Sequence, residues 1–504
     1  MTQANLVSDS RLSLGNNFEK FSTILLYCCA LAAPHSIAGS QGSFLAAAFF
    51  WLISCLLKKQ FTIKRTPLDL PLLGLFAWAT LSACFSYERM TSFSGLKQLA
   101  FFSLFYFVAT RACDGQRARR LALVLICSCS INVGYSIYQK IKGEGLKIDK
   151  IYPGSLINRK PPNNMFVEGD VLLRADGKPI TSLQVLSDVI DNGPADSMVK
   201  VDFRHNEMLL TGEILRRRFQ KQKDLVGVAR FGIEVSSARD FRAQGFYNHY
   251  STYAEVLQLI TSLLFGFLLA CPRKEKWFLF FCLLAVTFSA TMIFTATRAP
   301  LFSLGLSTFV ITLLSHGHRR LILIALLLVT LPVGVYAIAK WRGVGLIDLK
   351  DGSTTWRLEI WQEGLNLVKK HPVLGIGKGS ERKHWREWGM FRNGELPPGH
   401  FHSTFLQIAV WWGLPALLLY LAVIAQAIRT FASFLLTVKA DALHWQQRAT
   451  ILGALGGLVG FTSSSLVHFN FGDGEVVIVF WLVLGLAMAE ILAVKNSNSL
   501  MDKT

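Results

Sequence analysis

Three basic side chains occur where apolar segments begin or break. Arg242 precedes an apolar run in RAQGFYNHYSTY, Arg298 lies between two runs in TATRAP, and His402 precedes another in GHFHSTFLQIAVWWGLPA. Guanidinium groups bind phosphate oxygens through paired hydrogen bonds and can stabilise a phosphate leaving group. A neutral imidazole can take a proton from a hydroxyl near neutral pH. These residue types therefore suit group transfer from a diphosphate to a hydroxyl acceptor.

Arg298 is the strongest of the three candidates. Ionisable side chains at the ends of membrane segments often extend to the interface, which is the ordinary explanation for each of them. No other Lys, Arg, Asp, Glu or His occurs between Lys276 and His316. A cation placed between two closely spaced apolar segments needs an anionic partner, so Arg298 points to a ligand.

Four further residues are secondary candidates. His400 competes with His402 for the role of the base, because spacing alone does not separate two histidines two residues apart. His249 is adjacent to the Arg242 motif and has a structural alternative. Arg357 and Lys378 lie in a long polar segment, where they could steer an anionic substrate or simply form a solvated helix face.

Composition places the chain among integral membrane proteins. Of its 504 residues, 52% are apolar and only 17% are charged, and its mean hydropathy is +0.38. Its apolar residues form repeated runs of about 17–25, the length needed to cross a bilayer as a helix. The net charge of +19 fits Lys and Arg in cytoplasmic loops better than a nucleic-acid interface, so no nucleic-acid partner is expected.

We predict about twelve spans from the run lengths. Their approximate limits are 21–38, 41–57, 68–85, 97–112, 119–138, 251–271, 277–296, 299–315, 319–339, 402–428, 449–469 and 474–494. Basic residues gather in alternate short loops, and the positive-inside rule assigns those loops to the cytoplasm. Both termini are then cytoplasmic, and segments 139–250 and 340–401 face the other side.

The first of these outer segments has the pattern of a small α+β module. GEGLKIDKIYPGS at 143–155, EGDVLLRADGKPITS at 168–182 and the alternating VKVDF at 199–203 combine short strands with Gly and Pro turns. The module resembles a bacterial PDZ domain. In that resemblance the loop from Gly143 to Leu146 could capture a peptide C-terminus beside an open strand edge. The alternative is a structural insert without a ligand.

Metal and disulfide chemistry are not expected. All nine cysteines lie in or beside apolar runs, and no H-x-x-x-H or similar ligand cluster occurs. No cofactor is therefore predicted. A transporter would show broken helices with polar groups near the midplane and internal repeats, of which the sequence has little. A scaffold without catalysis would explain the insert but not the arginines.

The second half of the chain resembles the O-antigen ligase and polymerase superfamily of bacterial envelope glycan enzymes. The matching pieces are Arg-x-x-Gly-Phe before a span, Thr-x-Thr-Arg in a span break, and WRLEIWQEGLNLVKKHPVLGIGKGS in the outer loop. The ligase pattern is similar to H-[NSQ]-x9-G-x-x-[GTY]. Here His402, Ser403 and Gly413 satisfy it, and Ala416 departs from it at the last position.

The resemblance implies a metal-independent enzyme of the bacterial inner membrane that acts on an undecaprenyl-diphosphate-linked glycan. Arg242 and Arg298 would hold the diphosphate, and His402 would activate the hydroxyl of the acceptor. A ligase would transfer the glycan to lipid A core or a similar acceptor. A polymerase of O-antigen or exopolysaccharide is the alternative, which the sequence does not separate from the first.

The expected fold class is an all-α polytopic membrane protein with a small extracytoplasmic α+β insert. The expected divisions are 1–138 for membrane helices one to five, 139–220 for the PDZ-like insert, 221–250 for a linker with the Arg motif, 251–339 for helices six to nine, 340–401 for the large outer loop, and 402–504 for helices ten to twelve and a cytoplasmic tail.

Overall fold

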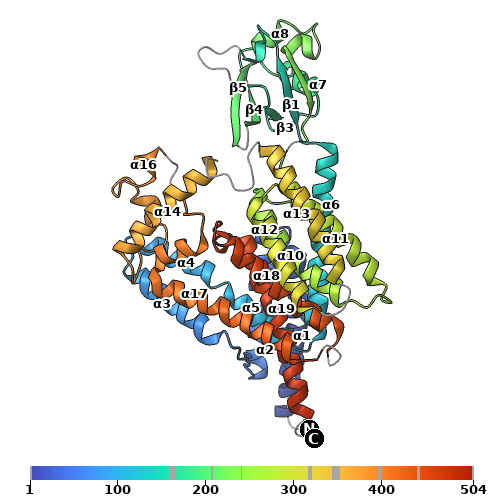
Figure 1. Ribbon diagram of the computed structural model, residues 1–504, viewed down its shortest axis with the longest axis vertical. Coiled ribbons are helices and arrows are strands. Elements are labelled where there is room, and N and C mark those ends of the chain that lie inside the picture. Colours follow the sequence, from blue (N-terminus) through green and yellow to red (C-terminus); the bar gives the residue numbers. More distant parts are fainter. Residues whose placement is uncertain are drawn as a thin grey trace. The chain divides into compact units, whose positions relative to one another are not determined.

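The computed structural model is mainly helical, with one antiparallel sheet (Figure 1). It describes residues 3–158, 166–205, 208–239, 241–315, 320–342, 352–395, 399–439 and 443–501. The chain divides into two compact units. The first consists of residues 1–133 and 244–504, and the second of residues 134–243.

The first unit is built of helices. In chain order they are α1 (Gln3–Ala32), α2 (Ile37–Lys58), α3 (Asp69–Cys84), α4 (Arg89–Leu99), α5 (Phe102–Arg111), α6 (Gln116–Lys142, which continues into the second unit), α10 (Tyr250–Ala270), α11 (Trp277–Phe294), α12 (Arg298–Leu314), α13 (Arg320–Arg342), α14 (Gly352–Lys370), α15 (Ser380–Lys383), α16 (Phe391–Gly394), α17 (Thr404–Thr437), α18 (Trp445–Ser464), the 3-10 turn η3 (Asn470–Gly472) and α19 (Gly474–Met501).

These helices make the chain a multi-pass membrane protein. Within the described residues, eight helical segments are long and apolar enough to span a bilayer, and α3 and α12 are shorter apolar helices. All twelve sequence-predicted ranges overlap described helices, although the count of twelve spans remains a prediction. One of the basic loops assigned to the cytoplasm contains His316, His318 and Arg319, and these three residues lie outside the described residues.

Two of the helices are enclosed by the others. Nearly all side chains of α10 and of the apolar part of α19 are buried, as expected for helices that are apolar on every face. Glycines bring α18 close to its neighbours. A Cβ added to Gly453 would lie 2.6 Å from Leu263 Cα, and one added to Gly460 would lie 2.2 Å from Ser307 Oγ. Small residues thus permit the close helix approach that is typical of membrane bundles.

The second unit contains the sheet. Its strands are β1 (Leu146–Ile151), β2 (Val171–Ala175), β3 (Lys178–Pro179), β4 (Met198–His205), β5 (Met208–Leu215) and β6 (Ile233–Ser237), with helices η1 (Leu156–Asn158), α7 (Leu183–Asp191), α8 (Arg216–Gln220) and α9 (Val228–Phe231). The strand order is β5-β4-β2-β1-β6, β3 pairs with β2, and every pairing is antiparallel.

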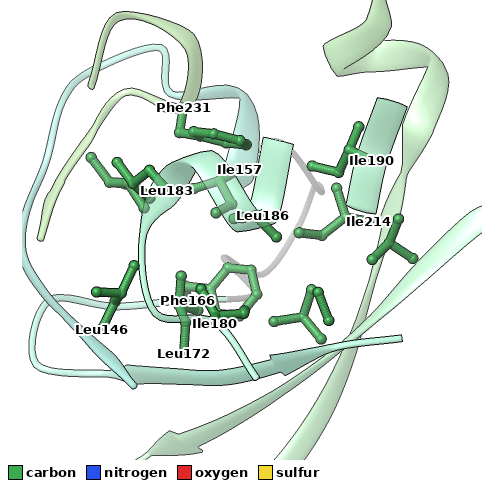
Figure 2. Packing of buried hydrophobic residues seen from close by; sticks show 14 of the residues in the cluster. Leu146, Ile157, Phe166, Leu172, Ile180, Leu183, Leu186, Ile190, Ile214 and Phe231 are labelled. Carbon is green, nitrogen blue, oxygen red and sulfur yellow. The ribbon is translucent and has the colours of Figure 1, made fainter. Parts of the chain in front are cut away.

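The core of this unit forms where α7 covers the sheet (Figure 2). Ser182 is the N-cap of α7, and its hydroxyl accepts a hydrogen bond from the Val185 amide at 3.3 Å. Leu186 and Ile190, on one face of the helix, are buried together with Phe231 and the strand residue Leu172. The expected small sheet with a covering helix is therefore present in this part of the chain.

The strand that follows the Gly143–Leu146 loop is paired on both sides. Strand β1 pairs with β2 at Leu146 and Lys147 and with β6 from Leu146 to Ile151, so an open edge for a peptide has to belong to another strand. Strand β6 falls within the range expected to be a linker. Its five residues complete the sheet, so the outer strands are β5 and β6.

Candidate active site

His402 lies in a turn immediately before α17. Its φ of 46° is in the left-handed region, which a residue with a side chain occupies only when its surroundings hold it there. The His402 amide donates to Nδ1 of His400 at 3.2 Å, and the two imidazole rings lie 4.1 Å apart. Ser403 then caps α17 by accepting from the Leu406 amide. Both histidine candidates therefore belong to one turn.

Neighbouring residues anchor this turn. Phe401, between the two histidines, is fully buried. Its amide donates to Gln407 Oε1 at 2.8 Å, and its carbonyl accepts from Trp361 Nε1 at 2.8 Å. The ring of Trp356 meets the His402 ring edge-on at 4.7 Å. Helix α14, which carries both tryptophans, thus packs against the histidine turn.

Both imidazoles are neutral at pH 7. Burial lowers the pKa of His402 to about 2, with smaller contributions from repulsion by a protonated His400 and by the Arg357 guanidinium. Burial and the charge of Arg382 lower the pKa of His400 to about 4. Because the Nδ1 atom of His400 accepts the His402 amide, the proton of a neutral His400 is on Nε2. A neutral His402 keeps a lone pair that can accept a proton.

Arg298 is the first residue of α12, after a sharp turn. Thr297 occupies the N-cap position, and Ala296 before it has a φ of 48°. The turn lies between two apolar helices, as the TATRAP motif predicts. Arg298 is partly buried, and the backbone amides at this helix start favour a nearby anion.

Arg298 and the histidine turn lie at the same end of the bundle. Helix α12 approaches α18 where Ser307 meets Gly460. Nine residues of helix, roughly 14 Å, separate Ser307 from Arg298. Four residues beyond Gly460, α18 ends at Ser464 and leads into the connection to α19. The Thr404 amide donates to carbonyls of that connection, so the start of α12 and the histidine turn both lie toward the end of the bundle at which α18 ends.

Arg242 belongs to the second unit, whereas the other six candidates belong to the first. The residue before it, Phe241, is buried, and Lys140 Nζ lies 4.6 Å above the Phe241 ring. Lys140 also donates to the Phe241 carbonyl. The backbone next to Arg242 is therefore fixed at the end of α6.

The rest of the Arg242 motif is anchored in the first unit. Gly245 has a φ of 57°, and a Cβ there would lie 1.9 Å from Asn132 Oδ1, so the position requires glycine. The Asn132 carbonyl oxygen accepts from the Phe246 amide at 3.2 Å. His249 caps α10 by accepting from the Ser251 amide at 3.2 Å. This contact supports the structural interpretation of His249.

The outer loop docks onto a break in α17. Gly413 has a φ of 78° and a ψ of 175°, which are not helical values. Such a break leaves carbonyls of the preceding turn without helical partners. The amides of Ile376 and Gly377 donate to the carbonyls of Val410 and Trp411, both at 2.9 Å. The PVLGIG segment of the outer loop therefore packs against the helix break at Gly413, the glycine of the H-S-x9-G pattern.

Lys378 has a local role in this contact. Its Nζ donates to Gln98 Oε1 at 2.8 Å and lies 5.2 Å above the Trp411 ring. Burial lowers the pKa of Lys378. The side chain therefore ties α4 to the outer loop and to α17, which favours a structural role. Arg357 differs, since its charge acts on His402.

Two buried carboxyl groups near the turn were not predicted as site residues. Glu381 accepts from Trp411 Nε1 at 3.0 Å and from Gln407 Nε2 at 3.2 Å, and burial raises its pKa. Glu255 lies inside α10 and accepts from His468 Nδ1 at 2.9 Å. An acidic residue within an otherwise apolar span is a signal that the sequence did offer for Glu255.

Within the described part of the chain, no group of three or more His, Cys, Asp or Glu residues could hold a metal ion. The site described above consists instead of imidazoles, arginines and aromatic rings at one end of a helical membrane bundle.

Comparisons with known proteins find similar sequences. Residues 256–421 match the family described as O-antigen ligase. The exopolysaccharide production protein ExoQ of Rhizobium meliloti (strain 1021) is 32% identical over 161 residues, which are 29% of this chain and 35% of that protein. The chain thus spans about a third of the length of this relative. Both findings support the O-antigen ligase and polymerase superfamily, and the family match includes Arg298, His400 and His402.

Proposed function

We propose that this chain is a glycosyltransferase of the O-antigen ligase type. It would move a glycan from an undecaprenyl-diphosphate carrier to a hydroxyl of lipid A core or a similar acceptor. The observation that carries the proposal is the neutral His402 turn at the bundle end where α12 begins with Arg298. The match of residues 256–421 to the O-antigen ligase family supports an enzyme of this general kind.

The proposed reaction is a displacement at the anomeric carbon. The acceptor oxygen forms a bond to that carbon, its proton passes to His402 Nε2 or Nδ1, and the bond to the diphosphate oxygen breaks. Arg298 stabilises the charge that develops on the departing undecaprenyl diphosphate. We assign the same role to Arg242 because of its Arg-x-x-Gly-Phe motif. No metal ion takes part, so activity should survive chelation of divalent ions.

A polymerase of the same superfamily is the second candidate. The relative is named an exopolysaccharide production protein, and Ala416 departs from the ligase pattern. The envelope glycan of a strain that lacks the gene distinguishes a ligase from a polymerase. Loss of long glycan from the acceptor, with lipid-linked polymer accumulating, indicates a ligase. Single-repeat glycan still attached to the acceptor indicates a polymerase. An unchanged envelope glycan profile contradicts both.

The proposed location is the bacterial inner membrane, with both termini in the cytoplasm and the histidine turn on the periplasmic side. The distribution of basic residues among short loops supports this orientation. For the second unit we propose a PDZ-like peptide-binding role. A peptide strand would add to β6 or β5, because both are outer strands of the sheet.

A further inference from the structure

Glu255 is a buried acid near the start of α10. Only 2% of the residue is exposed. Its carboxylate accepts hydrogen bonds from Ser464 Oγ, from His468 Nδ1 at 2.9 Å and from Asn470 Nδ2 at 3.3 Å. A buried carboxylate is costly unless its lone pairs are satisfied. All three donors come from the end of α18 and its connection to α19, so Glu255 fixes that connection to α10.

The same connection holds the start of α17. Thr404 Oγ1 donates to Asn470 Oδ1 at 2.9 Å. The Thr404 amide donates to the carbonyls of Ser465 at 2.9 Å and His468 at 3.0 Å. Asn470 therefore donates to Glu255 with its amide nitrogen and accepts from Thr404 with its oxygen. Thr404 follows His402 by two residues, so a short chain of hydrogen bonds joins Glu255 to the histidine turn.

His468 adds an electrostatic link. Because Nδ1 donates to Glu255, a neutral His468 carries its free lone pair on Nε2. A proton on His468 disfavours protonation of His400 and of His402, so His468 lies close enough to act on both rings. The three imidazoles thus form one cluster, and Glu255 sets the orientation of one of them.

We propose that Glu255 is a positioning residue of the active site, which acts through His468, Asn470 and Thr404 to hold the left-handed His402 turn in its reactive geometry. This inference rests on the proposed role of His402 as the base. The turn needs such support, because a φ of 46° at a histidine is unfavourable without surrounding contacts. Glu255 does not itself have to touch substrate.

The test is a double-mutant cycle on the full chain purified in detergent. Glu255→Gln keeps the size of the side chain but cannot accept from three donors, since one of its oxygens becomes an NH2 group. In the wild-type background, we expect kcat for glycan transfer from the lipid-linked donor to fall about 10–100-fold, with KM for the donor changed less than about twofold. In a His402→Ala background, the same substitution should change the residual rate less than about twofold.

Two further variants serve as references. Gln258→Leu removes a buried polar group one turn further along α10, where Gln258 donates to Ser307 Oγ at 2.9 Å. It should leave kcat within about threefold of wild type, because the hydrogen bonds described for the Gln258 side chain go to Ser262 and Ser307 and not to the histidine turn. Glu255→Asp keeps the carboxylate and should restore part of the activity that Glu255→Gln loses.

The outcomes separate the inference from the proposed function. A wild-type rate for Glu255→Gln, with His402→Ala inactive, overturns the positioning role alone. An equal fractional loss in both backgrounds also overturns it, since that result indicates general destabilisation. A wild-type rate for His402→Ala overturns the proposed base and with it the positioning role. The inference is supported if Glu255→Gln lowers kcat only when His402 is present and Glu255→Asp recovers part of that activity.

Discussion

A Cβ added to Gly413 would lie 1.9 Å from the carbonyl oxygen of Val373. The glycine interrupts α17, and the outer loop fills the space that a side chain would need. The amide of Leu414, the next residue, donates to the Pro372 carbonyl at 2.8 Å. The break in the membrane helix and the docking of the outer loop therefore depend on each other.

We expect Gly413→Ala to be strongly destabilising. A Cβ is unfavourable at this combination of φ and ψ, which only glycine adopts readily, and it would overlap with Val373. The substitution should therefore lower the free energy of unfolding by about 2–5 kcal/mol. The melting temperature of the detergent-solubilised protein should fall by about 2–5 °C. Gly42→Ala is the control, because an added Cβ meets no atom within 4 Å there and lies inside α2. Equal melting temperatures for the two variants would contradict the docking role of Gly413.

His402→Ala should abolish most glycan transfer. A positioned base contributes about 10²–10⁴-fold in rate. Alanine removes a partly buried imidazole but keeps the backbone amide that donates to His400, so expression and membrane insertion should persist. His400→Ala is the comparison and should be mild, because His400 supports the turn through one hydrogen bond from the His402 amide. An inactive His400→Ala beside an active His402→Ala would reassign the base to His400.

Arg298→Lys should also be severe although the charge is kept. An ammonium group cannot reproduce the planar, two-point contact of guanidinium with phosphate oxygens. We expect kcat to fall about 10²-fold or more, the loss that follows removal of one well-placed donor to a developing charge. Arg320→Lys, at the exposed start of α13, is the matched control. Full activity of Arg298→Lys would mean that Arg298 acts only as a distant charge.

Labelling of single cysteines tests the orientation. Exposed Ser182 and Glu387 (side chain 70% exposed) lie in the two segments assigned to the outside, and exposed Lys274 lies in a loop assigned to the cytoplasm. Cysteine at the first two positions should react with an impermeant thiol reagent in intact spheroplasts, and cysteine at 274 only after lysis. The background chain should carry Ser in place of all nine native cysteines, so that each variant has one cysteine. The reverse pattern would invert the topology.

Much of the membrane architecture could be predicted because its signals are local. A membrane helix can be predicted from the length and apolar composition of one continuous run, and each predicted range overlaps a helix. Strand β6 could not be placed in the same way. It has only five residues, and its pairing with β1 joins Ile233 to Ile151 across 82 positions of the chain. Only the assembled sheet shows that β6 closes the edge of β1.

The candidate site could be predicted in part. Motif order places Arg298 and His402 at helix starts. In the structure Arg298 is the first residue of α12, and His402 lies two residues before the first residue of α17. The partners of these residues follow from tertiary packing. Nothing in the spacing predicts that Trp356 contacts His402 or that Lys378 bonds to Gln98, because each pair joins different elements. A left-handed φ at His402 is likewise a consequence of the contacts around it.

The pH dependence of transfer should distinguish the free enzyme from the donor complex. Burial holds the pKa of His402 at about 2. A base works while it is unprotonated, so its activity is present above its pKa and lost as pH falls through that value. The profile of kcat/KM, which reports the free enzyme, should therefore show no acid limb from His402 between about pH 5 and pH 8. A bound diphosphate adds negative charge, which raises the pKa of the imidazole. The acid limb of kcat should therefore lie at higher pH than that of kcat/KM.

Arg357 provides the means to test this electrostatic explanation. Its positive charge is one cause of the low pKa of His402, so Arg357→Gln should raise that pKa and move the acid limb of kcat to higher pH. Arg386→Gln is the control, since exposed Arg386 instead lies 5.0 Å above the Trp385 ring. Its profile should match wild type. The explanation would be contradicted if the kcat/KM profile had an acid limb near the ordinary pKa of histidine and Arg357→Gln did not move it. A group other than the buried His402 would then accept the proton.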